Sequence, residues 1–291
     1  VLVRDEEAFA ETYPSVEFVA PRGWDALNNG GDTVVLHHAP SGTPLDAVPF
    51  AASWGGSDGR SLERIDPRGP SDEASNFASS TAPDGATPGA QNSRFAPDTA
   101  PPRPTFAEQV DSLTAAVVFN EPIRGESVRP ARFQFEDVAV TQTQVRADSI
   151  VRLSLSDRPT GEAVLVAEVQ DRVGNRLDRA SVPFARRPTP GTLVLNELLF
   201  DPRADDFDDR PNQVEYVELR NLTDHTLTLT GLTLTDRPTE TGPADTLRVR
   251  RRPRLAPGGF AGVAPAPKGA SPPPPSPPAP PSPPPPPAPA P

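Results

Sequence analysis

The chain has 291 residues, with 3 histidines, no cysteine, no methionine and a formal net charge of -11. This length allows two or three domains of about 100 residues, each with an ordinary hydrophobic core. The absence of cysteine excludes disulfides, zinc–thiolate sites and cysteine nucleophiles. The negative charge disfavours direct binding of nucleic acid, and no apolar run reaches the roughly 20 residues that a membrane-spanning helix needs.

Residues 1–92 predict a first strand, then one short helix, then further strands. Asp5 can cap the helix, Phe9 and Tyr13 share one of its faces, and Pro14 ends it. Strands are predicted at 1–3, 16–19, 33–37, 45–50 and 61–65. Residues 67–103 are rich in Pro, Gly, Ser, Asp and Thr without apolar periodicity, so they are predicted to be a loop and linker.

Residues 103–186 alternate apolar and polar side chains, which is typical of strands. The alternation is seen at Leu113, Ala115, Val117 and Phe119, at Phe133 and Phe135, at Val151, Leu153 and Leu155, and at Val164 and Val166. Short strands at this spacing predict an Ig-like β-sandwich with Greek-key connections.

Residues 191–263 predict a further set of strands, at 193–200, 214–220, 227–229, 232–235 and 247–250. The Leu-Thr repetition through 226–235 has period two, so leucines are expected to pack inward and threonines to face water. From residue 264 prolines dominate, which predicts a disordered tail with polyproline II character. The fold class predicted for the whole chain is therefore all-β.

Spaced motifs in the outer regions resemble the bacterial lamin-tail domain. The segments 195–199, 214–221, 229–236 and 255–260 resemble its first half, and the segments 27–34, 59–64 and 87–92 resemble its second half. The middle region, 103–186, is similar to bacterial Ig-like repeats through 119–123 and 171–177. The chain thus looks like two complementary partial lamin-tail copies, residues 1–92 and 191–263, on either side of an Ig-like domain.

The resemblance implies a secreted or surface-attached protein in which such modules space or tether other parts. A partial copy alone leaves an apolar sheet face uncovered, which is costly and prone to aggregation. We therefore expect residues 1–66 and 192–263 to pack together into one sandwich, either within the chain or swapped between chains in a homo-oligomer. The partner expected for such a module is a protein or a glycan.

One acidic loop could bind calcium. Its carboxylates are Asp201, Asp205, Asp206, Asp208 and Asp209. Carboxylates at this density suit Ca²⁺, which takes six to eight oxygen ligands. The spacing lacks the order of an EF-hand, so a solvated acidic loop is the alternative. No other cofactor is predicted.

Patterns suggestive of catalysis have simpler explanations. Residues 55–59 match G-x-S-x-G, and His225 could complete a triad, but a nucleophile elbow needs a helix after it, whereas residues 61–65 are strand-like. His37 and His38 are adjacent on a strand and point to opposite faces, so they cannot share one metal ion. The glutamates Glu197, Glu215 and Glu218 are expected on an exposed rim.

Four aromatic residues could build a carbohydrate platform, but core packing or loop anchoring is favoured for them: Trp24, Trp54, Tyr13 and Tyr216. Residues 221–223 form an N-glycosylation sequon. The sequence thus predicts a non-catalytic structural, adhesion or spacer module of an extracellular or cell-surface bacterial protein. The alternatives are an accessory module of a secreted hydrolase or nuclease, and a calcium- or carbohydrate-binding module.

Overall fold

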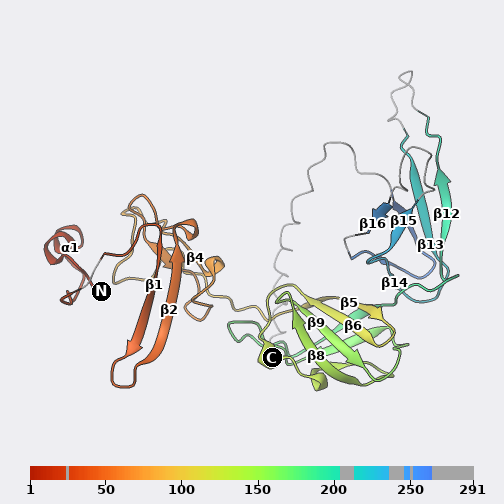
Figure 1. Ribbon diagram of the computed structural model, residues 1–291, viewed down its shortest axis with the longest axis horizontal. Coiled ribbons are helices and arrows are strands. Elements are labelled where there is room, and N and C mark those ends of the chain that lie inside the picture. The colour runs from red at the N-terminus through yellow and green to blue at the C-terminus, as the bar shows by residue number, and fades with distance from the viewer. Residues whose placement is uncertain (24–25, 204–212, 236–245, 250–251, 264–291) are drawn as a thin grey trace, which may run out of the picture. The chain divides into compact units, whose positions relative to one another are not determined.

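The computed structural model describes residues 1–23, 26–203, 213–235, 246–249, 252–263, and confirms the all-β class (Figure 1). The proline-rich tail predicted to be disordered lies outside the described residues. The chain divides into two compact units: the first contains Val1–Arg187 and His225–Arg254, and the second contains Pro188–Asp224 and the described residues from Leu255 onward. No helix in the described ranges is both long and apolar enough to cross a membrane.

The N-terminal part begins with the predicted helix. The helix is α1 (Glu6–Thr12), and the Asp5 carboxylate accepts a hydrogen bond from the Ala8 amide at 3.0 Å. The strands that follow are β1 (Gly31–His38), β2 (Thr43–Ala51), β3 (Leu62–Arg64) and β4 (Phe77–Ser79). β1 pairs with β2 and β3 with β4, both antiparallel. The strands predicted at 1–3 and 16–19 meet in one parallel bridge, between Leu2 and Val19.

The predicted linker 67–103 contains more structure than expected, because β4 and a 3-10 turn, η2 (Ala74–Asn76), lie within it. The buried Asn76 side chain holds this segment: its amide nitrogen donates to the carbonyls of Asp66 and Pro70, and its oxygen accepts from the Asp66 amide. Side-chain bonds to backbone thus organise a segment that lacks apolar periodicity.

Residues 103–186, which we call the Ig-like domain after the resemblance expected for them, are built on a seven-stranded sheet with the order β7-β10-β11-β5-β6-β9-β8. Its strands are β5 (Pro104–Asp111), β6 (Thr114–Phe119), β7 (Phe133–Gln134), β8 (Val140–Arg146), β9 (Ile150–Leu155), β10 (Ala163–Ala167) and β11 (Arg179–Ala185). Side chains of β6 and β9 pack in one buried core with side chains of β10 and β11. The two halves of the sheet therefore face each other across this core, as the two layers of a β-sandwich do. The Phe135 and Phe184 rings meet edge to face in this core, 5.1 Å apart.

The third region forms separate small sheets. Its strands are β12 (Leu193–Leu199), β13 (Tyr216–Asn221), β14 (Leu227–Thr228), β15 (Thr233–Thr235), β16 (Thr246–Arg248), β17 (Arg254–Leu255) and β18 (Phe260–Val263). β12, β13 and β18 make a three-stranded sheet. No described strand of residues 1–66 pairs with a described strand of residues 192–263. Packing of these two regions into one sandwich therefore stays a prediction.

The period-two prediction for residues 226–235 is wrong at one threonine. Thr233 and Thr235 are exposed as expected, but Thr228 is buried and its hydroxyl donates to the Glu108 carboxylate at 2.6 Å. Glu108 also lies 3.6 Å from the Arg252 guanidinium. A buried carboxylate on β5 needs such partners, and β14 supplies one of them.

Candidate functional site

The predicted calcium loop is described only at its start. Asp201 is exposed just after the end of β12, whereas Asp205, Asp206, Asp208 and Asp209 lie outside the described residues. Calcium binding by this loop therefore stays a prediction.

The G-x-S-x-G segment does not have the surroundings of a nucleophile elbow. It follows the 3-10 turn η1 (Ala52–Trp54), Ser57 is exposed, and the next element is strand β3. The backbone at Gly56 lies close to Leu62, and a larger residue would not fit there, because its Cβ would lie 2.9 Å from the Leu62 side chain. This geometry fits a glycine-rich loop packed on β3.

Two glutamates of the third region face each other. Glu197 on β12 is the direct cross-strand partner of Glu218 on β13. The Tyr216 hydroxyl donates to the Glu197 carboxylate at 2.6 Å, and this bond raises the pKa of Tyr216. The Asn196 amide donates to Glu218 at 2.6 Å. Asn196 and Glu197 are exposed, whereas Tyr216 and Glu218 are half-buried, so the exposed position expected for these glutamates is seen at Glu197 and only in part at Glu218.

The remaining candidates take structural positions. Trp54 packs on the Phe77 ring with centroids 5.4 Å apart, and Tyr13 packs on Phe9 at 5.1 Å. Trp24 lies outside the described residues. Asn221 of the sequon is fully buried at 0% exposure, so the folded chain does not offer its amide nitrogen to a glycosylating enzyme.

A buried glutamate joins two motifs of the lamin-tail resemblance. The Glu63 carboxylate accepts hydrogen bonds from the Thr87 hydroxyl at 2.8 Å, the Ser93 hydroxyl at 2.8 Å and the Arg94 amide at 2.9 Å. The Asn92 amide donates to the Arg64 carbonyl at 2.9 Å. Segments 59–64 and 87–92, which the sequence offers only as separate motifs, therefore form one structural unit.

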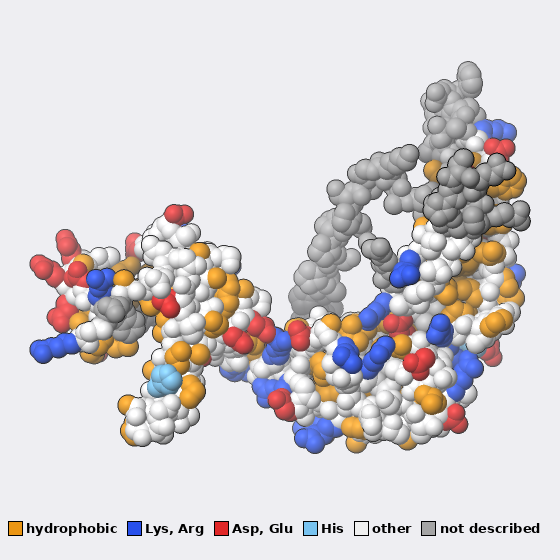
Figure 2. All heavy atoms as spheres, in the orientation of Figure 1, with side chains coloured by type: hydrophobic (Ala, Val, Ile, Leu, Met, Phe, Trp, Pro, Cys, Tyr) orange, Lys and Arg blue, Asp and Glu red, His pale blue; other side chains and the backbone are white. Residues whose placement is uncertain are grey.

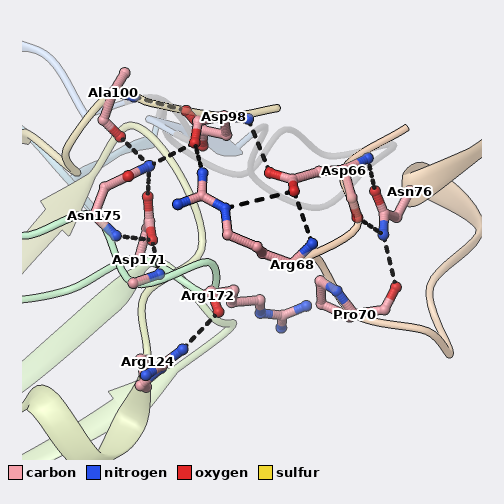
Figure 3. Close-up of polar contacts among 11 residues, drawn as sticks. Asp66, Arg68, Pro70, Asn76, Asp98, Ala100, Arg124, Asp171, Arg172 and Asn175 are labelled. Carbon is pink, nitrogen blue, oxygen red and sulfur yellow. Dashed lines mark hydrogen bonds and ion pairs between the residues drawn. The ribbon is translucent and has the colours of Figure 1, made fainter. Parts of the chain in front are cut away.

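A dense polar network connects this N-terminal part to the Ig-like domain (Figure 3). The Asp98 amide donates to Asp66 at 2.9 Å, which ties the linker to the N-terminal part. The Asn175 side chain donates to the carbonyls of Asp98 at 3.0 Å and Ala100 at 3.2 Å, which ties the same linker to the Ig-like domain. We call Asp66, Asp98, Ala100 and Asn175 the junction.

Ion pairs add to this connection. Arg172 of the Ig-like domain pairs with Glu73 of the N-terminal part and with Asp148 of its own domain. The Arg68 guanidinium donates to the Asp98 carbonyl. The linker is therefore held from both sides and does not behave as a free tether.

Three carboxyl groups converge beside the junction. One oxygen from each of Asp98, Glu121 and Asp171 lies within 4.8 Å of the others. Burial and the charges of Asp98 and Asp171 raise the pKa of Glu121 to about 7, against a hydrogen bond from Asn120 that lowers it. Oxygen ligands of this kind suit Ca²⁺. Both Asp171 oxygens, however, already accept hydrogen bonds, from the amides of Gly174 and Asn175 and from the Asn175 side chain.

Sequence reasoning missed this cluster because its members are far apart in the chain. Glu121 and Asp171 lie in segments of the Ig-like resemblance, 119–123 and 171–177, but these segments were offered as separate motifs, and Asp98 lies in the predicted linker. A buried Asp followed by Gly and Asn is a turn signal, and the structure shows the aspartate accepting from the amides of that turn. Nothing in the sequence places Asp98 or Glu121 beside it.

Comparisons with known proteins give little more. No family model matches the chain, and no curated protein matches it. Solved structures that match include the N-terminal part of the bacterial S-layer protein SbsC, at 12% identity over 56% of this chain and 43% of that chain. The S-layer protein rSbsC(31-844) matches at 12% identity, and domains 1-6 of surface layer protein SbsC at 11%, each over 32% of that chain. This chain thus spans less than half of those chains, and the TM-score of 0.28 is too low to support an argument.

Proposed function

We propose that the chain is a non-catalytic, load-bearing spacer module of a secreted or cell-surface bacterial protein. The observation that carries the proposal is the parallel pairing of the first and last strands of the Ig-like domain. Phe184 and Ala185 of β11 pair with Ala107 and Glu108 of β5.

Parallel terminal strands resist pulling for a geometric reason. The chain enters the domain at the start of β5 and leaves it at the end of β11, so tension on the two ends slides these strands past each other. Their hydrogen bonds are then loaded together and not one after another. The contact continues beyond β11, because the Arg187 amide donates to the Gln109 side chain at 3.2 Å and its guanidinium to the Val110 carbonyl at 3.3 Å.

Single-molecule force spectroscopy on the full chain tests the proposal. We expect one high-force event in which residues 104–185 release about 28 nm of chain, at about 3.4 Å per extended residue. Ala107→Pro should lower the force of this event, because proline removes a backbone donor from β5. Gln144→Pro on the edge strand β8 is the matched control: it should lower thermal stability but leave the peak force near that of the unmodified chain. A domain that extends without a force peak would contradict the load-bearing role.

Three further expectations remain proposals. The acidic loop beginning at Asp201 is proposed to bind Ca²⁺, which calorimetric titration of the full chain tests.

A swapped homo-oligomer is proposed because large apolar side chains are exposed on both open sheets, among them Leu36 and Leu45 on β1 and β2, and Leu195 and Leu198 on β12. Light scattering at increasing concentration tests it. Service as an accessory module of a secreted hydrolase or nuclease is the alternative function.

A further inference from the structure

An open pocket of about 560 Å³ on the Ig-like domain is lined only by polar side chains: Arg124, Glu126, Ser127, Arg129, Arg132 and Gln170. We call it the arginine pocket. Its volume falls within the range of about 300–1,000 Å³ that is usual for small-molecule sites. The lining has a net positive charge, whereas the chain as a whole has a formal net charge of -11. Figure 2 shows acidic side chains gathered around α1, whereas arginine side chains are frequent on the Ig-like domain.

The backbone that carries the arginines is fixed. The Arg124 amide donates to the Gln170 carbonyl at 2.8 Å, and the Ser127 hydroxyl donates to the Arg124 carbonyl at 2.7 Å while accepting from the Gln170 amide at 3.0 Å. Two 3-10 turns, η3 (Gly125–Ser127) and η4 (Pro130–Arg132), form the wall. Because the backbone of this wall is held before any ligand arrives, the entropy lost on binding is mainly that of the arginine side chains.

Two of the three guanidinium groups keep an uncompensated charge. Arg132 pairs with Glu168 at 3.2 Å. Arg124 donates to the neutral carbonyl of Arg172 at 3.0 Å, and neither Arg124 nor Arg129 forms an ion pair with a carboxylate among the described residues. Glu126 supplies the one negative charge in the lining. The planar guanidinium group presents paired N–H donors that match carboxylate, sulfate or phosphate oxygens.

We propose that the arginine pocket binds the acidic group of a carboxylated or sulfated saccharide. The lining contains no apolar or aromatic side chain that would favour a hydrophobic peptide. The side-chain amide of Gln170 can donate hydrogen bonds to sugar hydroxyls and accept hydrogen bonds from them. A polyanion such as nucleic acid is repelled by the chain as a whole, whereas a short acidic saccharide meets only the local charge.

Calorimetric titration of the full chain tests this site with a galacturonate disaccharide, a sulfated disaccharide, a neutral disaccharide and inorganic phosphate. We expect an acidic disaccharide to bind, the neutral one not to bind, and the affinity to fall as NaCl is raised. Arg129→Ala should weaken binding about tenfold, since it removes one charge-assisted contact. Glu126→Gln should tighten binding about threefold, because it removes the opposing carboxylate.

Arg146→Ala is the matched control, since Arg146 is exposed on β8 and outside the pocket, and its loss should leave the affinity unchanged. Circular dichroism melts show whether each variant is folded, and the opposite directions expected for Arg129→Ala and Glu126→Gln cannot both result from damage to the fold. Absence of heat with both acidic disaccharides overturns the proposal, and so does equal weakening by Arg146→Ala. Phosphate that binds as tightly as the acidic disaccharides overturns the assignment to a saccharide.

Discussion

At the scale of single residues, Glu63 and Glu121 show how the surroundings of a glutamate shift its pKa in opposite directions. Burial acts to raise the pKa of Glu63, but hydrogen bonds from Ser93 and Thr87 outweigh it and hold the pKa below the usual value. Burial also raises the pKa of Glu121, and there the nearby carboxylate of Asp98 adds to the effect and brings the pKa to about 7. Glu63 therefore favours the fold as a carboxylate, and Glu121 favours it as a carboxylic acid.

The raised pKa of Glu121 predicts a pH effect on stability. Between about pH 4.5 and 7 the folded chain keeps a proton on Glu121 that the unfolded chain releases, so the free energy of unfolding falls as pH rises through this window. Glu121→Gln should remove that loss and be more stable than the unmodified chain at pH 8 by about 1 kcal/mol, an amount reduced for solvent screening. Urea unfolding at pH 5 and pH 8 measures both.

EDTA belongs in every buffer of this experiment, so that no divalent cation neutralises the three carboxylates. Glu136→Gln, at an exposed glutamate of the same domain, should leave the pH dependence unchanged. Parallel pH profiles for Glu121→Gln and the unmodified chain would refute the prediction.

At the scale of elements, apolar periodicity predicted the strands that pack through side chains. The alternation at Val151, Leu153 and Leu155 marks β9, and all three are buried as expected. β5 was missed because it begins with a proline and buries the polar residues Glu108 and Gln109, so it shows no clean alternation. η2 and β4 were missed because their segment shows no apolar periodicity: the bonds of Asn76 to backbone hold η2, and β4 contributes the aromatic contact of Phe77 with Trp54. The junction was missed because its members meet only after folding.

Asn221 organises the end of β13 in the second unit. Its side chain donates to the carbonyls of Leu255 at 3.1 Å and Ala256 at 2.9 Å, and its oxygen accepts from the Thr223 amide at 2.9 Å. These bonds hold the segment from Leu255 that leads into β18 through the tight turn at Gly258, where φ is 64°. Asn221 therefore fixes the position of a whole strand.

Asn221→Asp should destabilise the second unit by about 3 kcal/mol, because the buried carbonyl of Leu255 and the part-buried carbonyl of Ala256 lose their donor and face a carboxylate. Hydrogen exchange should show faster exchange of the β18 amides, with the Ig-like strands unchanged. Thr223→Val, which removes the hydroxyl bond to the Asn221 oxygen at 2.7 Å but keeps the Asn221 donor, is the milder control. Unchanged protection of β18 in Asn221→Asp would exclude this role.

At the scale of the molecule, the junction decides whether the N-terminal part and the Ig-like domain act as one body. The β1–β2 hairpin exposes much of its apolar surface, including Leu36 at 58% and Leu45 at 61%, and an isolated hairpin is marginally stable. The polar contacts of Asn175 and Arg172 couple the N-terminal part to a domain with a full core. A spacer under load needs such coupling, because a free tether between domains would extend first.

The coupling predicts one cooperative transition for these two parts of the chain. Both tryptophans, Trp24 and Trp54, belong to the N-terminal part, so tryptophan fluorescence reports its unfolding. Far-ultraviolet circular dichroism reports all strands, and among the described ones those of the Ig-like domain are the largest group. The two signals should coincide in the unmodified chain. The double variant Asn175→Ala, Arg172→Ala removes the side-chain bonds that the Ig-like domain makes to the linker and the N-terminal part. This loss should destabilise the N-terminal part by about 2 kcal/mol. The fluorescence transition should then occur at a lower urea concentration than the dichroism transition. Arg176→Ala, which loses the pair with Glu168 on the Ig-like domain alone, should leave the signals together. If the double variant still unfolds in one transition, the junction does not couple the two parts.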